Sequence, residues 1–165
     1  MRPILATPLK QADIALDAVV AASSAADLDA VMEIERLSFA TPWVRQAFAD
    51  EIERPWARLE ILRDEASGRA IGFCNYWLVA DELHILNIAV HPDFRKQGQA
   101  SLLVRHILAA ARQGKVRVVS LEVRASNHAA RSLYRKFGFC EVGVRPKYYA
   151  DNGEDAVLMD LEMTA

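Results

Sequence analysis

The sequence predicts a single α+β domain in which a mixed, mostly antiparallel sheet of seven strands is flanked by four helices. Three observations lead to this class. A length of 165 residues suits one domain with a proper core. Most apolar segments alternate at period two and are separated by short turns, which is typical of antiparallel strands. Residues 84–123 instead run strand, helix, strand, and such a crossover favours two parallel neighbouring strands.

We treat residues 1–14 as an N-terminal extension and residues 15–165 as the folded domain. The first stretch mixes polarities, contains two prolines and shows no period. Periodicity, turn residues and helix caps then predict the next elements. They are a strand at 15–22, a helix at 25–37 capped by Ser24 and Asp27, a helix from Pro42 to about Glu53 capped by Thr41, and hairpin strands at 56–63 and 70–79.

The second half of the chain is predicted in the same way. Residues 116–123 are β-branched and apolar, which indicates a buried strand. The elements are a strand at 82–91, a helix at 98–113 that ends before Gly114, a strand at 116–123, a helix at 128–137 that Asn127 begins and Gly138 ends, and hairpin strands at 139–146 and 154–163.

Composition narrows the class of protein. The chain is 52% hydrophobic and 25% charged, which is ordinary for a soluble globular protein. No apolar run approaches the ~20 residues of a membrane span, and the N-terminus lacks a signal-peptide core. We therefore expect a cytoplasmic monomer with no membrane partner. The two cysteines and four histidines show no metal-ligand spacing, so no metal is expected.

The net charge of −2 hides an asymmetry. Residues 91–147 carry 12 Lys and Arg against 3 Asp and Glu, whereas both flanking segments are acidic. Charge runs often form solvated faces only. A basic middle also suits a polyanionic cofactor, and acidic surroundings suit a cationic substrate. The small negative net charge argues against direct nucleic-acid binding.

Residues 84–101, HILNIAVHPDFRKQGQAS, carry the most informative local pattern. An apolar strand ends in a basic, Gly-containing turn that leads directly into a helix. A helix start leaves backbone N–H groups unpaired and favours an anion, typically phosphate. Gly98 would let the backbone approach a diphosphate, and Ala100 keeps the next turn narrow. Taken alone, the stretch is equally compatible with a plain strand–helix connection.

The turn Arg95-x-x-Gly98-x-Ala100 resembles the R/Q-x-x-G-x-G/A pyrophosphate loop of the GNAT acetyltransferases. Downstream, LEVRASNHAARSLYRKFGF (121–139) resembles the next motif of that superfamily. Together with KYY and EDAVLM, these motifs are similar to the bacterial ribosomal-protein-alanine N-acetyltransferase branch, from roughly Ala15 to Met163. The resemblance implies a single-domain GNAT fold that uses acetyl-CoA as co-substrate.

The resemblance also implies where acetyl-CoA binds. It would fill a splay between strands 84–91 and 116–123, with pantetheine on strand backbone and the diphosphate on the turn. Ala100 replaces the last glycine of the motif, which the pattern permits, and Gln99 replaces a usual apolar residue. The predicted cofactor-binding residues are Ile88, Ala89, Val90, Arg95, Lys96, Gln97, Gly98, Gln99, Ala100, Ser101 and Asn127.

Glu122 is a carboxylate in an otherwise apolar strand, which costs free energy unless it is partnered. An ion pair with Arg124 or another arginine is one interpretation. General-base catalysis is the other, because an ammonium must lose a proton before it attacks a thioester. Partial desolvation would raise the pKa of Glu122 into a useful range. The family's catalytic glutamate falls on Glu122, which implies the second role.

Tyr134 lies in the predicted helix 128–137. It can be an amphipathic residue with its ring in the core and its hydroxyl in water. The family's general acid falls on Tyr134, which implies that the hydroxyl donates a proton to the departing CoA thiolate. A backbone N–H of Ile88–Val90 would stabilise the oxyanion.

Four aromatic residues are candidates for acceptor binding. Phe39 and Trp43 lie between the first two helices, and Tyr148 and Tyr149 lie in the last hairpin loop. They can simply cover the core and the sheet end. In the resembling family the first connection forms a wall of the acceptor groove, and the Tyr pair lines the pocket for the substrate's first residue. Such a wall would admit a small side chain and leave the amine facing Glu122.

These features predict an enzyme that transfers acetyl from acetyl-CoA to a protein N-terminal α-amine by direct attack. The resemblance implies the N-terminal alanine of a small-subunit ribosomal protein as acceptor. Broader N-terminal or lysine acetylation, acetylation of a small-molecule amine, and a non-catalytic acyl-CoA-binding module are the alternatives. The presence of both Glu122 and Tyr134 argues against the last of these.

Overall fold

The computed structural model describes residues 18–164. Within that range the chain forms one seven-stranded sheet and four α-helices, which confirms the predicted fold class. The strands are β1 (Ala18–Ala22), β2 (Ala57–Asp64), β3 (Ala70–Val79), β4 (Glu82–Val90), β5 (Val118–Arg124), β6 (Cys140–Arg145) and β7 (Ala156–Glu162). The helices are α1 (Leu28–Ser38), α2 (Arg45–Glu53), α3 (Gln99–Gln113) and α4 (His128–Lys136), with short 3-10 turns η2 (Ala25–Asp27) and η3 (Pro92–Phe94). The predicted extension 1–14 and the start of the strand predicted at 15–22 lie outside the described residues.

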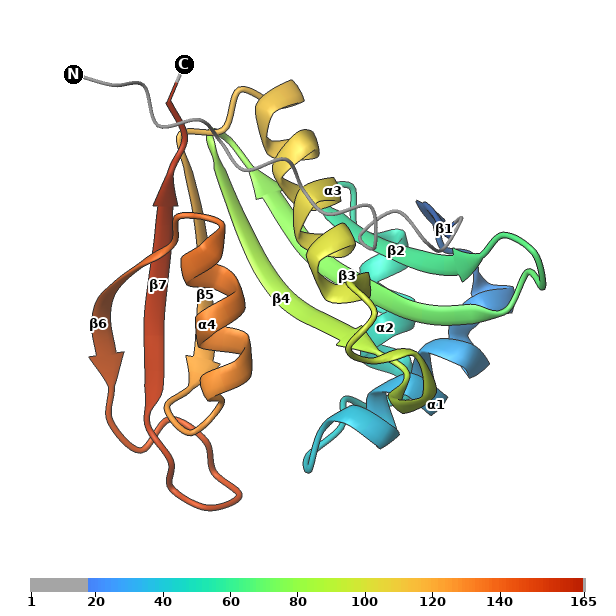
Figure 1. Ribbon diagram of the computed structural model, residues 1–165, viewed down its shortest axis with the longest axis horizontal. Helices are drawn as coiled ribbons and strands as arrows, with labels where there is room; N and C mark the ends of the chain where they lie inside the picture. Colours follow the sequence, from blue (N-terminus) through green and yellow to red (C-terminus); the bar gives the residue numbers. More distant parts are fainter. Residues whose placement is uncertain (1–17, 165) are drawn as a thin grey trace.

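The sheet has the strand order β1-β2-β3-β4-β5-β7-β6 (Figure 1). β4 and β5 are parallel, and every other neighbouring pair is antiparallel. Parallel pairing joins only Glu82–Ile85 to Val118–Leu121, and beyond these residues the two strands diverge. β4 bulges at Leu86, where its register with β3 shifts, and a bulge bends its strand. The splay predicted between strands 84–91 and 116–123 is therefore confirmed.

Helices cover both faces of the sheet, with α3 and α4 on one face and α1 and α2 on the other (Figure 1). On the first face, Leu103 of α3 belongs to the same buried cluster as Leu121 of β5. On the second face, Ile34 of α1 and Phe48 of α2 cluster with Phe73 of β3. The splay thus opens between two packed layers. A ligand bound in it can be reached from either face of the sheet.

Helix α2 begins later than predicted. It starts at Arg45 after Val44, whose backbone is extended, so the predicted start at Thr41–Pro42 is wrong. The reason lies in α1, where the buried Glu35 accepts a hydrogen bond at Oε1 from the backbone N–H of Trp43, at 3.0 Å. This tertiary contact outweighs the local preference of Pro for a first helical position.

Two other predicted caps are confirmed. The backbone N–H of Ser24 donates to Asp27 Oδ2 at 2.9 Å. Asn127 Oδ1 accepts from the backbone N–H of Ala130 at 3.1 Å and begins α4. Side-chain oxygens at these positions satisfy N–H groups that a helix start leaves free.

Candidate active site

The splay between β4 and β5 opens into a cavity of about 470 Å³. The end of β4, the turn before α3 and one side of α4 line it. The lining includes every predicted cofactor-binding residue except Gln97, namely Ile88, Ala89, Val90, Arg95, Lys96, Gly98, Gln99, Ala100, Ser101 and Asn127.

Backbone N–H groups at the start of α3 form an anion-binding turn. Within residues 18–164, the N–H groups of residues 96–101 find no hydrogen-bond acceptor. Lys96 and Gly98 have φ angles of 60° and 78°, in the left-handed region that glycine adopts without cost. Successive N–H groups in such a turn converge, and the dipole of the 15-residue helix adds positive potential. The geometry fits a diphosphate.

The side chain of Arg95 holds this turn in place through two hydrogen bonds. Its Nε donates to the carbonyl of Val90 at 2.9 Å, and its Nη2 donates to Ser38 Oγ at 3.1 Å. Arg95 therefore fixes the turn to β4 and α1. Gln97 does not line the cavity, because its Nε2 turns back to the carbonyl of Asp93 at 3.5 Å.

The edge of β4 that faces the splay is unpaired at its C-terminal end. Ile88–Val90 pair with residues 72–74 of β3 on one side, but pairing with β5 ends at Ile85. A free strand edge offers N–H and C=O groups to an extended ligand, which then binds as an additional strand. This arrangement is what the predicted pantetheine contact requires.

Tyr134 lines the same cavity from α4 and is only 8% exposed. Its ring packs against Phe139, with ring centroids 5.6 Å apart. Burial raises the pKa of the phenol to about 12, with a smaller contribution from Tyr149. The hydroxyl is therefore protonated at neutral pH and is able to donate a proton.

Glu122 points to the opposite face of β5. Side chains alternate across a strand, and the neighbours Leu121 and Val123 belong to the core cluster beneath α3. Glu122 Oε2 lies 2.8 Å from Nε2 of His84. Both line another cavity of about 470 Å³, which is completed by Trp77, Val79, Glu82, Leu86 and Tyr148. The two predicted catalytic side chains thus flank the splay from opposite faces.

His84 is a polar partner that sequence reasoning missed. Its only local signal is a polar side chain within an apolar strand, since Glu122 lies 38 positions away. The hydrogen bond with His84 lowers the pKa of Glu122, outweighing burial, and Arg145, 3.9 Å away, adds to this effect. The predicted upward shift of the Glu122 pKa is therefore wrong. The carboxylate is ionised at neutral pH, and the predicted partner Arg124 binds other groups.

The tyrosine pair lies beside Glu122. Tyr148 lines the Glu122 cavity and packs edge-on against Tyr149, with centroids 5.1 Å apart. The guanidinium of Arg124 lies 4.0 Å from the ring centroid of Tyr149. Burial is the main cause that raises the pKa of Tyr149, and the charge of Glu122 contributes.

Phe39 and Trp43 face different spaces. Phe39 lines the cavity that contains Tyr134. Trp43 packs against Phe48 at 5.2 Å and lines a groove beside α2 that includes Trp77. Trp77 also lines the Glu122 cavity, so the groove and that cavity adjoin. The four predicted acceptor residues therefore do not share one pocket: three lie on the Glu122 side and Phe39 lies on the other.

In the described part of the chain, His, Cys, Asp and Glu side chains form no cluster of three that could hold a metal ion. None of the helices between residues 18 and 164 has both the length and the apolar character needed to cross a membrane. The cysteines are free thiols, Cys74 buried and Cys140 exposed.

Comparison with known proteins adds an independent line of support. The profile of the acetyltransferase (GNAT) family matches residues 28–139. A Bacillus subtilis protein, provisionally named a ribosomal protein bS18-alanine N-acetyltransferase, is 42% identical over 134 residues, 81% of this chain and 87% of its own length. The ribosomal protein bS18-alanine N-acetyltransferase of Escherichia coli K12 is 35% identical over 140 residues, 84% of this chain and 93% of its own. The crystal structure of the Escherichia coli ribosomal-protein-S18-alanine N-acetyltransferase superposes with a TM-score of 0.83 and 33% identity, covering 90% of this chain and 95% of that one.

Proposed function

Since this chain belongs to the GNAT family of acetyltransferases and is an acetyl-CoA-dependent N-acetyltransferase, we propose that its acceptor is the N-terminal alanine of ribosomal protein bS18. The observation that carries the proposal is a similarity that spans most of the chain and most of two relatives named for this acceptor. Two chemically distinct cavities on either side of one splay support it.

Acetyl-CoA supplies the acetyl group as an activated thioester. On its side of the splay, the N–H groups of residues 96–101 hold the diphosphate, and the free edge at Ile88–Val90 pairs with the extended arm. An N–H of that edge stabilises negative charge on the reacting carbonyl oxygen. The Tyr134 phenol donates a proton to the departing thiolate, for which its raised pKa keeps it protonated.

The acceptor enters from the face that holds Glu122. An N-terminal ammonium loses a proton to the ionised Glu122, directly or through a water, and the free amine then attacks without a covalent acyl-enzyme. His84 orients the carboxylate. Tyr148 and Tyr149 beside it leave room for a small first side chain.

The rest of the acceptor follows the α1–α2 connection. Trp43 lines the groove that adjoins the Glu122 cavity, and Phe39 stands at the cofactor side of the same connection. Acetyl-CoA and ribosomal proteins meet in the bacterial cytoplasm, so we place the reaction there. We propose that the protein acts as a monomer and contacts no nucleic acid directly.

The test is CoA release with acetyl-CoA and a peptide panel. The panel holds free N-terminal Ala, Ser and Met peptides, an N-terminally blocked lysine peptide and a small polyamine. Turnover confined to free Ala or Ser ends is the expected result. Activity only on the blocked lysine peptide or the polyamine would overturn the acceptor. Acetyl-CoA binding without turnover on any acceptor would point to a binding module instead.

A further inference from the structure

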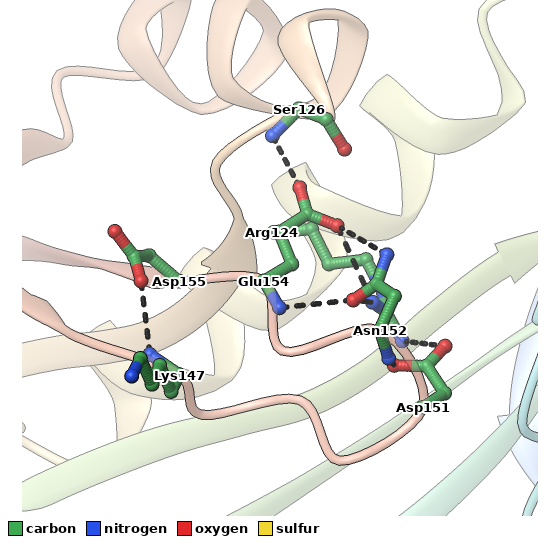
Figure 2. Close-up of polar contacts among 7 residues, drawn as sticks. All are labelled: Arg124, Ser126, Lys147, Asp151, Asn152, Glu154 and Asp155. Atoms are coloured by element: carbon green, nitrogen blue, oxygen red, sulfur yellow. Dashed lines mark hydrogen bonds and ion pairs between the residues drawn. The ribbon is translucent and has the colours of Figure 1, made fainter.

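One arginine anchors the loop that carries the tyrosine pair. Residues 146–155, which we call the tyrosine loop, connect β6 to β7 and include Tyr148 and Tyr149. Arg124, the last residue of β5, reaches into this loop (Figure 2). The loop contributes no residue to the cavity that contains Tyr134.

The guanidinium of Arg124 contacts several loop side chains at once. Its Nη2 lies 2.9 Å from Asp151 Oδ2. Its Nη1 lies 3.3 Å from Glu154 Oε2 and 3.3 Å from Asn152 Oδ1 (Figure 2). The ring of Tyr149 packs over the same group, with 4.0 Å between Cζ and the centroid. A planar fork with fixed donors and an apolar face can make all these contacts together.

Further hydrogen bonds make the loop a defined structure. Glu154 Oε1 accepts from the backbone N–H of Ser126 at 2.7 Å, which joins the loop to the residues that follow β5. Asp155 Oδ1 accepts from the N–H of Lys147 at 2.9 Å, and the N–H of Tyr149 donates to the Glu154 carbonyl at 3.1 Å. Hydrogen bonds from Ser126 lower the pKa of Glu154 to about 2, so this anchor stays charged at neutral pH.

The anchored Tyr149 ring packs on Arg124, whose side chain points to the same face of β5 as that of Glu122. Glu122 and Arg124 are two residues apart in β5, so their side chains share a face. The charge of Glu122 acts on Tyr149, and Tyr149 in turn acts on Tyr134. Because Tyr149 packs against Tyr148, which lines the Glu122 cavity, the position of the loop affects the space beside Glu122.

We propose that Arg124 is a positioning residue for the acceptor, holding the tyrosine loop so that Tyr148 and Tyr149 wall the pocket for the acceptor's first side chain. The inference rests on the proposed function, because it assigns that pocket to an N-terminal residue. Lysine at position 124 keeps the charge but is a point donor, so it cannot hold Asp151, Glu154 and the Tyr149 ring together.

The experiment compares Arg124→Lys with the matched control Arg117→Lys. Arg117 precedes the other end of β5 and pairs with Asp81, far from the loop. Three quantities are measured: amide hydrogen exchange of residues 147–155, acetyl-CoA affinity, and steady-state kinetics with peptides that begin with Ala or Leu. Asp151→Asn, which removes one partner and leaves β5 unchanged, serves if Arg124→Lys does not fold.

In Arg124→Lys we expect amides of the tyrosine loop to exchange about tenfold faster or more. The kcat/KM for the Ala peptide should fall about tenfold, mainly through KM, because misplacement of a positioning group by about 1 Å has effects of this size or larger. The preference for Ala over Leu should narrow, and the Kd of acetyl-CoA should not change. Asp151→Asn should change loop exchange, KM and the Ala preference in the same directions but by smaller factors. Arg117→Lys should match the wild type.

Unchanged exchange and kinetics in Arg124→Lys would overturn the proposal. Faster exchange with unchanged KM and unchanged Ala preference would also overturn it, because Arg124 would then only stabilise the loop. If the wild type acetylates no free N-terminal peptide, the proposed function fails and the positioning role fails with it. That result is seen before any variant is compared, so the two failures are distinguishable.

Discussion

Replacing Glu122 with Gln tests whether this carboxylate takes the proton from the acceptor amine. Glutamine keeps the size and a hydrogen bond to His84 but cannot accept a proton. General acid–base catalysis contributes roughly 10²- to 10⁴-fold, or about 3–5 kcal/mol. We expect kcat with an Ala peptide to fall by about this factor. The Kd of acetyl-CoA should not change, because Glu122 does not line the cavity that contains the anion-binding turn.

The pH dependence of this variant gives a second readout. Hydrogen bonding with His84 lowers the pKa of Glu122, so the wild-type carboxylate is ionised at neutral pH. The wild type should therefore show no loss of activity from Glu122 between pH 6 and 9. A peptide α-amine has a pKa of about 8, and its free fraction rises about tenfold from pH 7 to pH 9. The Glu122→Gln variant can use only the free amine, so its kcat should rise with that fraction. The ratio of wild-type kcat to variant kcat should therefore shrink about tenfold from pH 7 to pH 9.

The assay is CoA release under saturating acetyl-CoA across this pH range. Glu60→Gln is the matched control, because Glu60 Oε2 lies 2.5 Å from Nε2 of His106 in a separate cavity. Removing the charge of that carboxylate should leave kcat unchanged. A Glu122→Gln enzyme with wild-type kcat, or with the same loss of kcat at pH 7 and pH 9, would show that Glu122 is not the general base.

Two other variants test the remaining parts of the site, and a third tests the buried carboxyl of Glu35 in α1. Tyr134→Phe removes only the hydroxyl, so kcat should fall about 10²-fold with unchanged acetyl-CoA affinity, and a normal kcat would exclude the phenol as proton donor. Gly98→Ala places a side chain at φ 78°, which costs about 1–2 kcal/mol, so calorimetric titration should show weaker acetyl-CoA binding by about tenfold; unchanged affinity would argue against the turn as the diphosphate site. Burial raises the pKa of Glu35, so its contribution to stability is largest below the unfolded pKa near 4.5 and declines as pH rises through the folded value. Glu35→Gln should remove that decline in urea unfolding measured over a pH series that starts below 4.5, and an unaltered slope would contradict the raised pKa of Glu35.

Local rules of the chain account for much of the fold. Period-two alternation predicted the strands, and the strand–helix–strand order of residues 84–123 predicted the single parallel pair, because short crossovers leave few other topologies. Asn127 was predictable as a cap because its side chain reaches an N–H three residues away. The anion-binding turn was predictable for the same reason, since Gly98 and a helix start are adjacent in sequence.

The chemistry of the site depended on contacts between distant residues. No residue near Glu122 in the sequence indicates that His84 is its partner. The hydrogen bond to His84 makes the pKa of Glu122 shift down, whereas an upward shift was predicted. A hydrogen bond between Glu35 and the backbone of Trp43 explains why α2 starts later than the sequence predicted. Arg124 was considered only as a partner of Glu122, yet it binds a loop about 30 positions further along the chain.

The strands, most helix caps, the parallel crossover and the anion-binding turn were thus predictable from the sequence, because neighbouring backbone groups and side-chain periods decide these features. The assembled fold was needed to show on which side of β5 Glu122 and Tyr134 lie, what lowers the pKa of Glu122 and what holds the tyrosine loop. These properties arise from hydrogen bonds and charges between strands and loops that meet only when the sheet is assembled, and pairings of that kind leave no spacing in the sequence from which they could be predicted.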